Sequence, residues 1–266
     1  MLRKDLEQFL ADTFQYGNFQ DSCQNGLQVE GKDEIQTLVC GVSFNLPLLH
    51  EAIRLHADAL LVHHGFFGKD FFTLRGVMRE KVKLLLLHDL SLFGIHLPLD
   101  AHEEYGNNAQ LFAAIGGDGL KPFDVGFIGQ NPRRLSLEGI LDLFHQQLHP
   151  PNFFGTLHDA EHTSMLIPKR RYDFVYFANG PKTPQTIGIL SGGGAKYYRE
   201  ALNNGVDTFI TGSVDEFIPA LSYETGTNFV CLGHYWSEKP GIWALQHAIE
   251  HKFDMKAVFV DIANMI

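Results

Sequence analysis

The chain has 266 residues, of which 45% are hydrophobic and 20% are charged, as is typical of a folded globular protein. Its 21 lysine and arginine residues face 31 aspartate and glutamate residues, so the net charge is −10 and a general binder of nucleic-acid backbones is not expected. No apolar run reaches the length of about 18 residues that a membrane span needs, and the first residues lack the apolar core of a signal peptide. Cys23, Cys40 and Cys231 form no CxxC pair, which favours buried free thiols and a cytoplasmic location.

The spacing of apolar residues predicts alternating helices and strands in the first part of the chain. The expected elements are helices over 3–14, 47–56, 79–88 and 107–115, and strands over 35–42, 58–63 and 91–95. A strand, a helix of about ten residues and a second apolar strand form a βαβ unit, so these strands should be parallel. We therefore predict an N-terminal α/β half over residues 1–122, which ends at the glycine-rich run 116–119.

The remaining residues, 123–266, are predicted to hold an irregular middle and a second α/β half. The middle carries a helix over 136–148 and strand-like runs at 153–157 and 172–177, with no visible chemistry. The second half is predicted to contain strands over 186–190, 207–211, 228–232 and 256–261, with helices over 195–203, 215–224 and 240–251.

The two halves resemble each other in sequence. Residues 52–61 match residues 201–210 in outline, and the spacing His96-x-x-x-Asp100 recurs as His234-x-x-x-Glu238. Each histidine–carboxylate pair directly follows a short apolar strand. The expected fold is therefore α/β, with two similar halves of mainly parallel strands and a site in the crevice between them, where strand ends commonly carry chemistry.

Six residues are candidates for that site, all at the ends of predicted strands. They are His63, His64, His96, Asp100, His234 and Glu238. Imidazole and carboxylate groups are the usual ligands of zinc, iron, manganese and cobalt, and a carboxylate can bridge two ions. Adjacent histidines can also cap a strand end, and the H-x-x-x-D spacing is common, so the joint occurrence of all six carries the prediction.

Three other features are weaker candidates. His102 lies two residues after Asp100 and is expected beside the site at most. The run 191–194, with three glycines before a helix, can bind an anion or simply make a tight turn. Cys23 lies in a polar segment without an obvious base, so a nucleophilic role is not expected.

Several segments together resemble the Nif-three-like family, also called the GTP cyclohydrolase I type 2 homologues. The segments are 24–29, 61–65, 94–102, 107–111, 209–212 and 233–238. The resemblance extends over nearly the whole chain. One departure is Gly65, where many members have proline, and the chain also lacks the large central insertion of longer members. Any function carried by that insertion is absent here.

The resemblance implies a dinuclear metal centre in an α/β protein that assembles as a toroidal homohexamer, with the sites facing the inner cavity. It implies that Glu238 bridges the two ions and that His96 lies beside them, either as a neighbour or as an extra ligand. The implied ligands are His63, His64, Asp100, His234 and Glu238.

Two functions stay open at this point. The first is a metal-dependent hydrolase that acts on a nucleotide-like substrate through a metal-activated water, with His96 or His102 as a proton shuttle. The second is a non-catalytic metal-binding carrier or scaffold that forms a ring. The net charge makes a nucleic-acid partner less expected, and the residues do not choose among Zn, Fe, Mn, Co and Ni.

Overall fold

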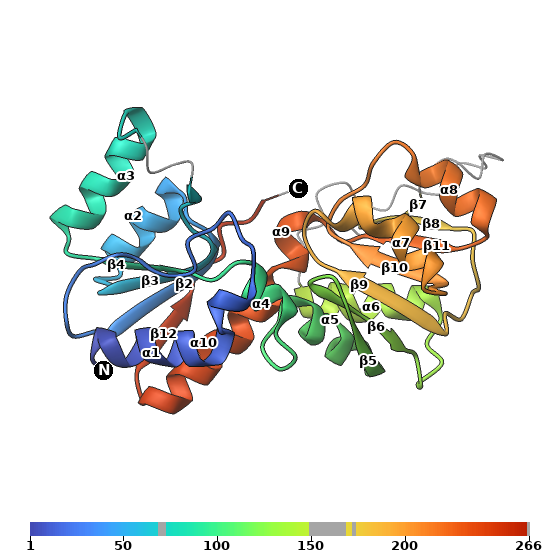
Figure 1. Cartoon of the computed structure of the whole chain (residues 1–266), viewed down its shortest axis with the longest axis horizontal. Coiled ribbons are helices and arrows are strands. Elements are labelled where there is room, and N and C mark those ends of the chain that lie inside the picture. Colours follow the sequence, from blue (N-terminus) through green and yellow to red (C-terminus); the bar gives the residue numbers. More distant parts are fainter. Residues whose placement is uncertain (69–72, 149–168, 172–173, 265–266) are drawn as a thin grey trace. The chain divides into compact units, whose positions relative to one another are not determined.

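The computed structural model divides the chain into two compact units (Figure 1). The first unit comprises residues 1–106 with 241–263, and the second comprises residues 107–240 with Asn264. The residues that the structure describes are 1–68, 73–148, 169–171 and 174–264. Among them, no helix has both the length and the apolar character needed to cross a membrane.

The first unit contains a five-stranded sheet. Its strands are β1 (Gly26–Val29), β2 (Thr37–Ser43), β3 (Ala59–His64), β4 (Ser91–Gly94) and β12 (Lys256–Phe259). The strand order is β1-β4-β3-β2-β12, in which only β1 runs antiparallel to its neighbour. The parallel pairs follow from the helical crossovers α2 (Leu46–Arg54) and α3 (Gly76–Leu87) that join β2 to β3 and β3 to β4.

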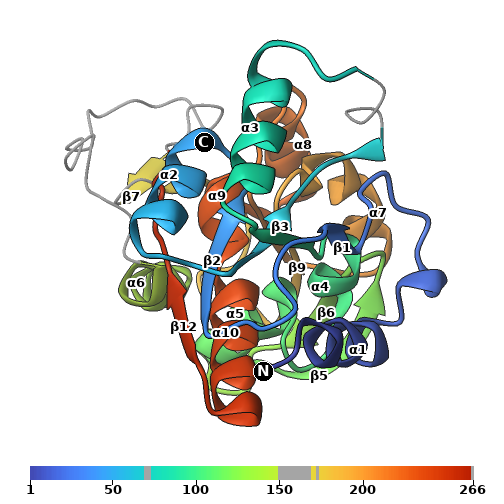
Figure 2. The same ribbon diagram turned by 90° about the vertical axis from the view of Figure 1, so that its left-hand side faces the viewer.

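Helices cover both faces of this sheet, with α2 and α3 on one face and α1 (Arg3–Phe14) and α10 (Lys239–Phe253) on the other (Figure 2). Because successive strand side chains point to opposite faces, β3 contributes to both layers. Leu61 packs with the layer that contains α1 and α10. Leu60 and Val62 pack with α2 and α3. Packing on both faces therefore fixes β3, and its last two residues, His63 and His64, lie at the end of this buried strand.

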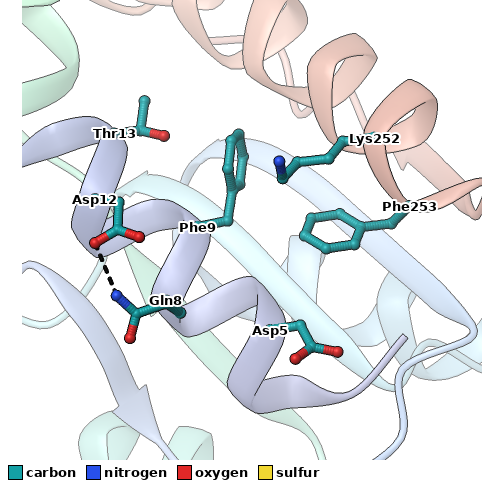
Figure 3. Close-up of a pocket in the computed structure, with 7 residues that line it drawn as sticks. All are labelled: Asp5, Gln8, Phe9, Asp12, Thr13, Lys252 and Phe253. Carbon is teal, nitrogen blue, oxygen red and sulfur yellow. Dashed lines mark hydrogen bonds between the residues drawn. The ribbon is translucent and has the colours of Figure 1, made fainter.

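The helix α10 packs beside α1, as Figure 3 shows around a pocket on this face. The rings of Phe9 and Phe253 meet edge to face, with centroids 5.7 Å apart, and the ammonium of Lys252 lies 5.1 Å from the Phe9 centroid. Leu245 and Ile249 of the same helix are fully buried in the core of the first unit. The C-terminal helix thus completes the N-terminal unit.

The second unit contains a seven-stranded mixed sheet. Its strands are β5 (Asp118–Phe123), β6 (Gly126–Gln130), β7 (Lys169–Arg171), β8 (Phe174–Ala178), β9 (Thr186–Leu190), β10 (Thr208–Thr211) and β11 (Asn228–Cys231). The order is β5-β6-β9-β10-β11-β8-β7, and only β9, β10 and β11 are parallel to one another. Its main helices are α5 (Asn107–Ile115), α6 (Leu137–Leu148), α7 (Tyr198–Asn203) and α8 (Ile218–Thr225).

The predicted similarity of the two halves is confirmed in detail. Strands β1-β4-β3-β2 of the first sheet have the same relative order and directions as β8-β11-β10-β9 of the second. In each unit, an aspartate before the middle strand accepts two consecutive backbone N–H groups that lead into the first parallel strand. In the first unit, Oδ2 of Asp58 accepts from the backbone N–H groups of Gln36 and Thr37 at 2.9 and 3.1 Å. In the second unit, Oδ2 of Asp207 accepts from those of Gln185 and Thr186 at 2.8 and 3.1 Å.

The units divide the chain differently from the predicted boundary between residues 122 and 123. The helix α5 packs with β6 and α6 of the second unit, while α10 and β12 return to the first sheet. The middle is also more regular than predicted, because the unpredicted strands β5 and β6 extend the second sheet by antiparallel pairing. Strand β8 confirms the strand-like run predicted at 172–177 over its described residues. The mainly parallel arrangement therefore holds for the first sheet and not for the second. The strand-like run at 153–157 lies outside the described residues.

Candidate metal centre

His63 is the penultimate residue of β3, and its side chain is fully buried. Its Nδ1 lies 2.9 Å from the backbone oxygen of Ile95. A carbonyl oxygen can only accept a hydrogen bond, so Nδ1 carries the proton and Nε2 offers its lone pair. This fixed tautomer is the one that metal-binding histidines commonly use.

His64, the last residue of β3, points to the opposite face of the strand and is partly exposed. Its Nδ1 lies 3.0 Å from the hydroxyl of Ser43, at the end of the neighbouring strand β2. The rings of His63 and His64 still lie close together, with centroids 4.5 Å apart. Nδ1 of His63 therefore contacts the residue that follows β4, and Nδ1 of His64 contacts the last residue of β2.

The turn after β4 supplies two more candidates. His96 precedes the short helix α4 (Leu97–Ala101), and its ring centroid lies 5.1 Å from that of His63. Asp100 lies one turn further along α4 and is buried, with Oδ2 3.6 Å from Nε2 of His63. The short helix thus brings a histidine and a carboxylate, four residues apart, to the end of β3.

Asp21 also contacts this group of side chains, although the sequence does not predict it. Its Oδ1 lies 2.8 Å from Nδ1 of His96, and its side chain is only 3% exposed. Burial alone would raise the pKa of Asp21, but hydrogen bonds from His96, Cys23 and Asn25 hold that pKa well below its usual range. Nothing in the polar segment 21–29 indicates which histidine this carboxylate contacts.

Within the first unit, one ligand atom from each of His63, His64 and His96 lies within 4.8 Å of the others. All three rings are held through Nδ1 by a neighbouring oxygen. Oriented imidazoles beside a buried carboxylate, Asp100, form a donor set that fits a divalent transition metal.

The second unit holds the remaining two candidates. His234 begins the short helix α9 (His234–Ser237) directly after β11, and its Nε2 lies 3.1 Å from Oε1 of Glu238. Glu238 is only 3% exposed. The predicted ligands therefore occur as two sets, one in each unit, and only the pair His234 and Glu238 has its equivalent in the other unit, His96 and Asp100.

The glycine run 191–194 lies directly against the second set. Gly192 adopts a positive φ of 60°, and a Cβ at this position would collide with the carboxylate of Glu238 and lie 3.1 Å from Nε2 of His234. Its backbone N–H donates to the hydroxyl of Ser237 at 2.9 Å, and its carbonyl accepts from the N–H of Gly212 at 3.0 Å. The run is thus a tight turn that lets the backbone approach the two ligands closely.

The other candidates have structural contacts. Nδ1 of His102 accepts the backbone N–H groups of Glu104 and Tyr105 at 3.1 and 3.0 Å, and its ring stacks on that of Tyr105. Burial lowers the pKa of His102. These contacts cap the turn after α4, and proton transfer by His96 or His102 stays a prediction. Burial raises the pKa of Cys23 to about 11, which keeps its thiol protonated near neutral pH.

Comparison with known proteins finds similarity along the full chain. The family model described as Duf34/NIF3 (NGG1p interacting factor 3) matches residues 1–265. Proteins named GTP cyclohydrolase 1 type 2 homolog from Yersinia pestis and Pasteurella multocida are 36% and 35% identical to the chain, and the alignments cover 99% and 98% of both partners. A solved structure titled protein ybgI, of unknown function, is 33% identical with a TM-score of 0.85 and full coverage of both chains. A second structure, TTHA1606 from Thermus thermophilus, is 28% identical with a TM-score of 0.84 and the same coverage.

Proposed function

The chain belongs to the Duf34/NIF3 family, and from this membership and the two ligand sets we propose that it is a dinuclear metal-binding protein that acts as a metal-dependent hydrolase. The observation that carries the proposal is the group of three imidazoles in the first unit, each anchored through Nδ1. For His63 and His96, whose Nδ1 partners are a carbonyl and a carboxylate oxygen, such anchoring favours the lone pair of Nε2 as a metal donor.

In the proposed centre, both units contribute ligands to two divalent ions. His234 and Glu238 alone are two protein ligands, fewer than the three that catalytic zinc sites generally have. The first unit would supply the others, and Glu238 would bridge the ions. The proposed ligands are His63, His64, Asp100, His234 and Glu238.

The proposed substrate class is taken from the names of the curated relatives, which designate them homologues of a GTP cyclohydrolase. We take GTP and other nucleotides as the first substrates to test. Two divalent ions, when bound, supply a water whose pKa is lowered toward neutrality. The chain itself would orient the site, because the buried carboxylates of Asp100 and Glu238 are held in or directly after short helices that follow fixed strands.

Metal content and turnover, measured on the same preparations, test this function. We expect close to two ions per chain and product release from GTP or another nucleotide. Glu238→Gln preserves the side-chain shape and removes the charge, so it should reduce both metal content and turnover. Glu224→Gln, at an exposed position of α8, is the matched control and should leave both unchanged.

Two results would contradict parts of the proposal. Absence of bound metal would remove its basis. Full metal occupancy without turnover on a broad panel of nucleotides and phosphoesters would instead support the non-catalytic carrier or scaffold. We also propose a homohexameric ring in the cytoplasm, and light scattering of the purified chain tests its assembly by distinguishing a hexamer from a monomer.

A further inference from the structure

A buried carboxylate from outside the repeated part of the chain contacts the metal-binding group of the first unit. Asp21 precedes β1, in the segment between α1 and the first sheet, and reaches His96 at the end of β4. We propose that His96 is a metal ligand in addition to the five named above, and that Asp21 is the positioning residue that fixes its imidazole for that role. This inference rests on the proposed metal site.

The carboxylate of Asp21 is saturated by protein donors. Oδ1 accepts from Nδ1 of His96 at 2.8 Å and from the backbone N–H of Cys23 at 3.0 Å. Oδ2 accepts from the backbone N–H of Leu97 and from the side-chain amide of Asn25, both at 3.0 Å. With two donors on each oxygen, Asp21 is equipped to hold other groups in place and not to bind an ion directly.

The same segment holds the backbone beneath the imidazole. The side-chain oxygen of Asn25 accepts the backbone N–H of His96 at 2.7 Å. Asp21 accepts the next backbone N–H, that of Leu97, so two consecutive peptide groups of the turn are fixed by residues 21 and 25. Both the position of the His96 Cα and the orientation of its ring are therefore set from this segment.

The tautomer of His96 follows from its partner. An ionised carboxylate can only accept, so Nδ1 of His96 carries the proton and Nε2 keeps its lone pair for the pocket that contains His63 and His64. A carboxylate behind a ligating histidine also increases the basicity of the metal-facing nitrogen.

The second half of the repeat shows a different arrangement. Nε2 of His234, which corresponds to His96, lies 3.1 Å from Oε1 of Glu238, the carboxylate four residues further along its own segment. The carboxylate held by Nδ1 of His96 comes from a segment 75 residues away in the sequence. We therefore expect loss of Asp21 to weaken the ion that His96 would bind more than the other ion.

The test uses the full chain, freed of metal by a chelator and titrated with Zn²⁺ against a chromophoric competitor. Removal of an outer hydrogen-bond partner of a metal ligand typically weakens metal binding about 10–100-fold, and we expect this loss for Asp21→Ala. Asp21→Asn retains one acceptor oxygen without the charge and should show a smaller loss. Ser22→Ala, at the exposed neighbouring position, is the control and should bind Zn²⁺ as the wild type does.

Two further measurements separate positioning from a loss of folding. Circular dichroism shows whether each variant is folded at the temperature of the titration. The absorption spectrum of Co²⁺-loaded protein reports the ligand field, and it should change in Asp21→Asn but not in Ser22→Ala. Should both Asp21 variants fail to fold, nitrogen NMR of the zinc-loaded wild type decides the question, because His96 must appear with a proton on Nδ1 and a metal-bound Nε2.

The possible outcomes are distinct. Folded Asp21 variants with wild-type Zn²⁺ affinity and an unchanged Co²⁺ spectrum would overturn the inference, as would a proton on Nε2 of His96 in the zinc-loaded wild type. A wild-type chain that binds no Zn²⁺ would overturn the proposed metal site itself. A selective loss of affinity in the Asp21 variants would support the positioning role.

Discussion

Adding a methyl group at Gly192 tests directly whether His234 and Glu238 of the second unit bind metal. Its Cβ would collide with the carboxylate of Glu238, so Gly192→Ala should displace that ligand and lower metal content. The substitution also costs about 1–3 kcal/mol because the residue has a positive φ. Gly205→Ala is the matched control, since Gly205 also has a positive φ, of 77°, with no atom within 4 Å of its Cβ position.

Elemental analysis and thermal melting of both glycine variants separate the two effects. Both variants should lose stability, but only Gly192→Ala should lose metal. Equal metal content in the two variants would show that the close approach of the backbone to Glu238 is unimportant for metal binding.

The candidate ligands were easier to predict from the sequence than the residues that hold them. His63, His64, Asp100 and Glu238 could be proposed because imidazoles and carboxylates occur together at the ends of several predicted strands. Asp21 could not, because its contact with His96 depends on how a loop without periodicity folds back onto the sheet. A hydrogen bond between residues so far apart leaves no local pattern in a single sequence.

Asp58 stabilises the start of β2 by accepting backbone hydrogen bonds, and Asp207 does the same for β9 in the second unit. Burial would raise the pKa of Asp58, but hydrogen bonds from Lys32 and from the N–H groups of Gln36 and Thr37 lower it below the ordinary value. A carboxyl group with a lowered pKa in the folded state stabilises the protein above its unfolded pKa of about 3.9, and this stabilisation is lost as the pH falls through the folded-state value.

We therefore expect Asp58→Asn to lower the free energy of unfolding by about 1–3 kcal/mol at pH 7, as is typical for hydrogen bonds to a charged group. The difference from wild type should shrink as the pH falls below about 4. Urea denaturation at several pH values measures it, with Asp12→Asn at an exposed position as the control. A difference that stays constant down to the lowest pH would contradict the assigned role of the ionised carboxylate.

At the level of elements, the C-terminal helix α10 stabilises a unit that begins at the opposite end of the chain. Leu245 is fully buried between this helix and the first sheet. Leu245→Ala should lower the free energy of unfolding by about 2–5 kcal/mol, as other buried leucines do when truncated. Leu87→Ala, at a position of α3 that is 66% exposed, should have little effect. Chemical denaturation of both variants makes the comparison, and equal stabilities would contradict the packing of α10 on this unit.

Most helices and strands were predictable from the sequence, but the sheet that a helix covers and the strand that another strand pairs with were not. Apolar spacing predicted the helix at 240–251 within two residues at its C-terminal end, but it could not indicate which sheet the apolar face covers. Strand β5 was missed because Gly119 and Pro122 give its sequence the appearance of a turn and most of its side chains are exposed. Its pairing with β6 comes from the hairpin and not from hydrophobic periodicity.

For the whole molecule, the proposed metal centre, with ligands from both units, would have a thermodynamic consequence. An ion bound only by the folded chain stabilises it by RT ln(1 + [L]/Kd), which is about 2.7 kcal/mol when the free ion is at about 100 times Kd. If ligands from both units hold the ions, metal binding should couple the unfolding of the two units. Removal of metal by a chelator should then lower the melting temperature and separate one transition into two.

Calorimetry of the chain with Zn²⁺ and with excess chelator measures this coupling. Glu238→Gln removes a ligand from the second unit, so its melting should respond much less to Zn²⁺ than that of the wild type. His247→Ala removes an exposed imidazole that belongs to neither ligand set, and its response should match the wild type. A chelator effect confined to the transition of the first unit would show that the ions are held by that unit alone, since only ligands drawn from both units can couple their unfolding.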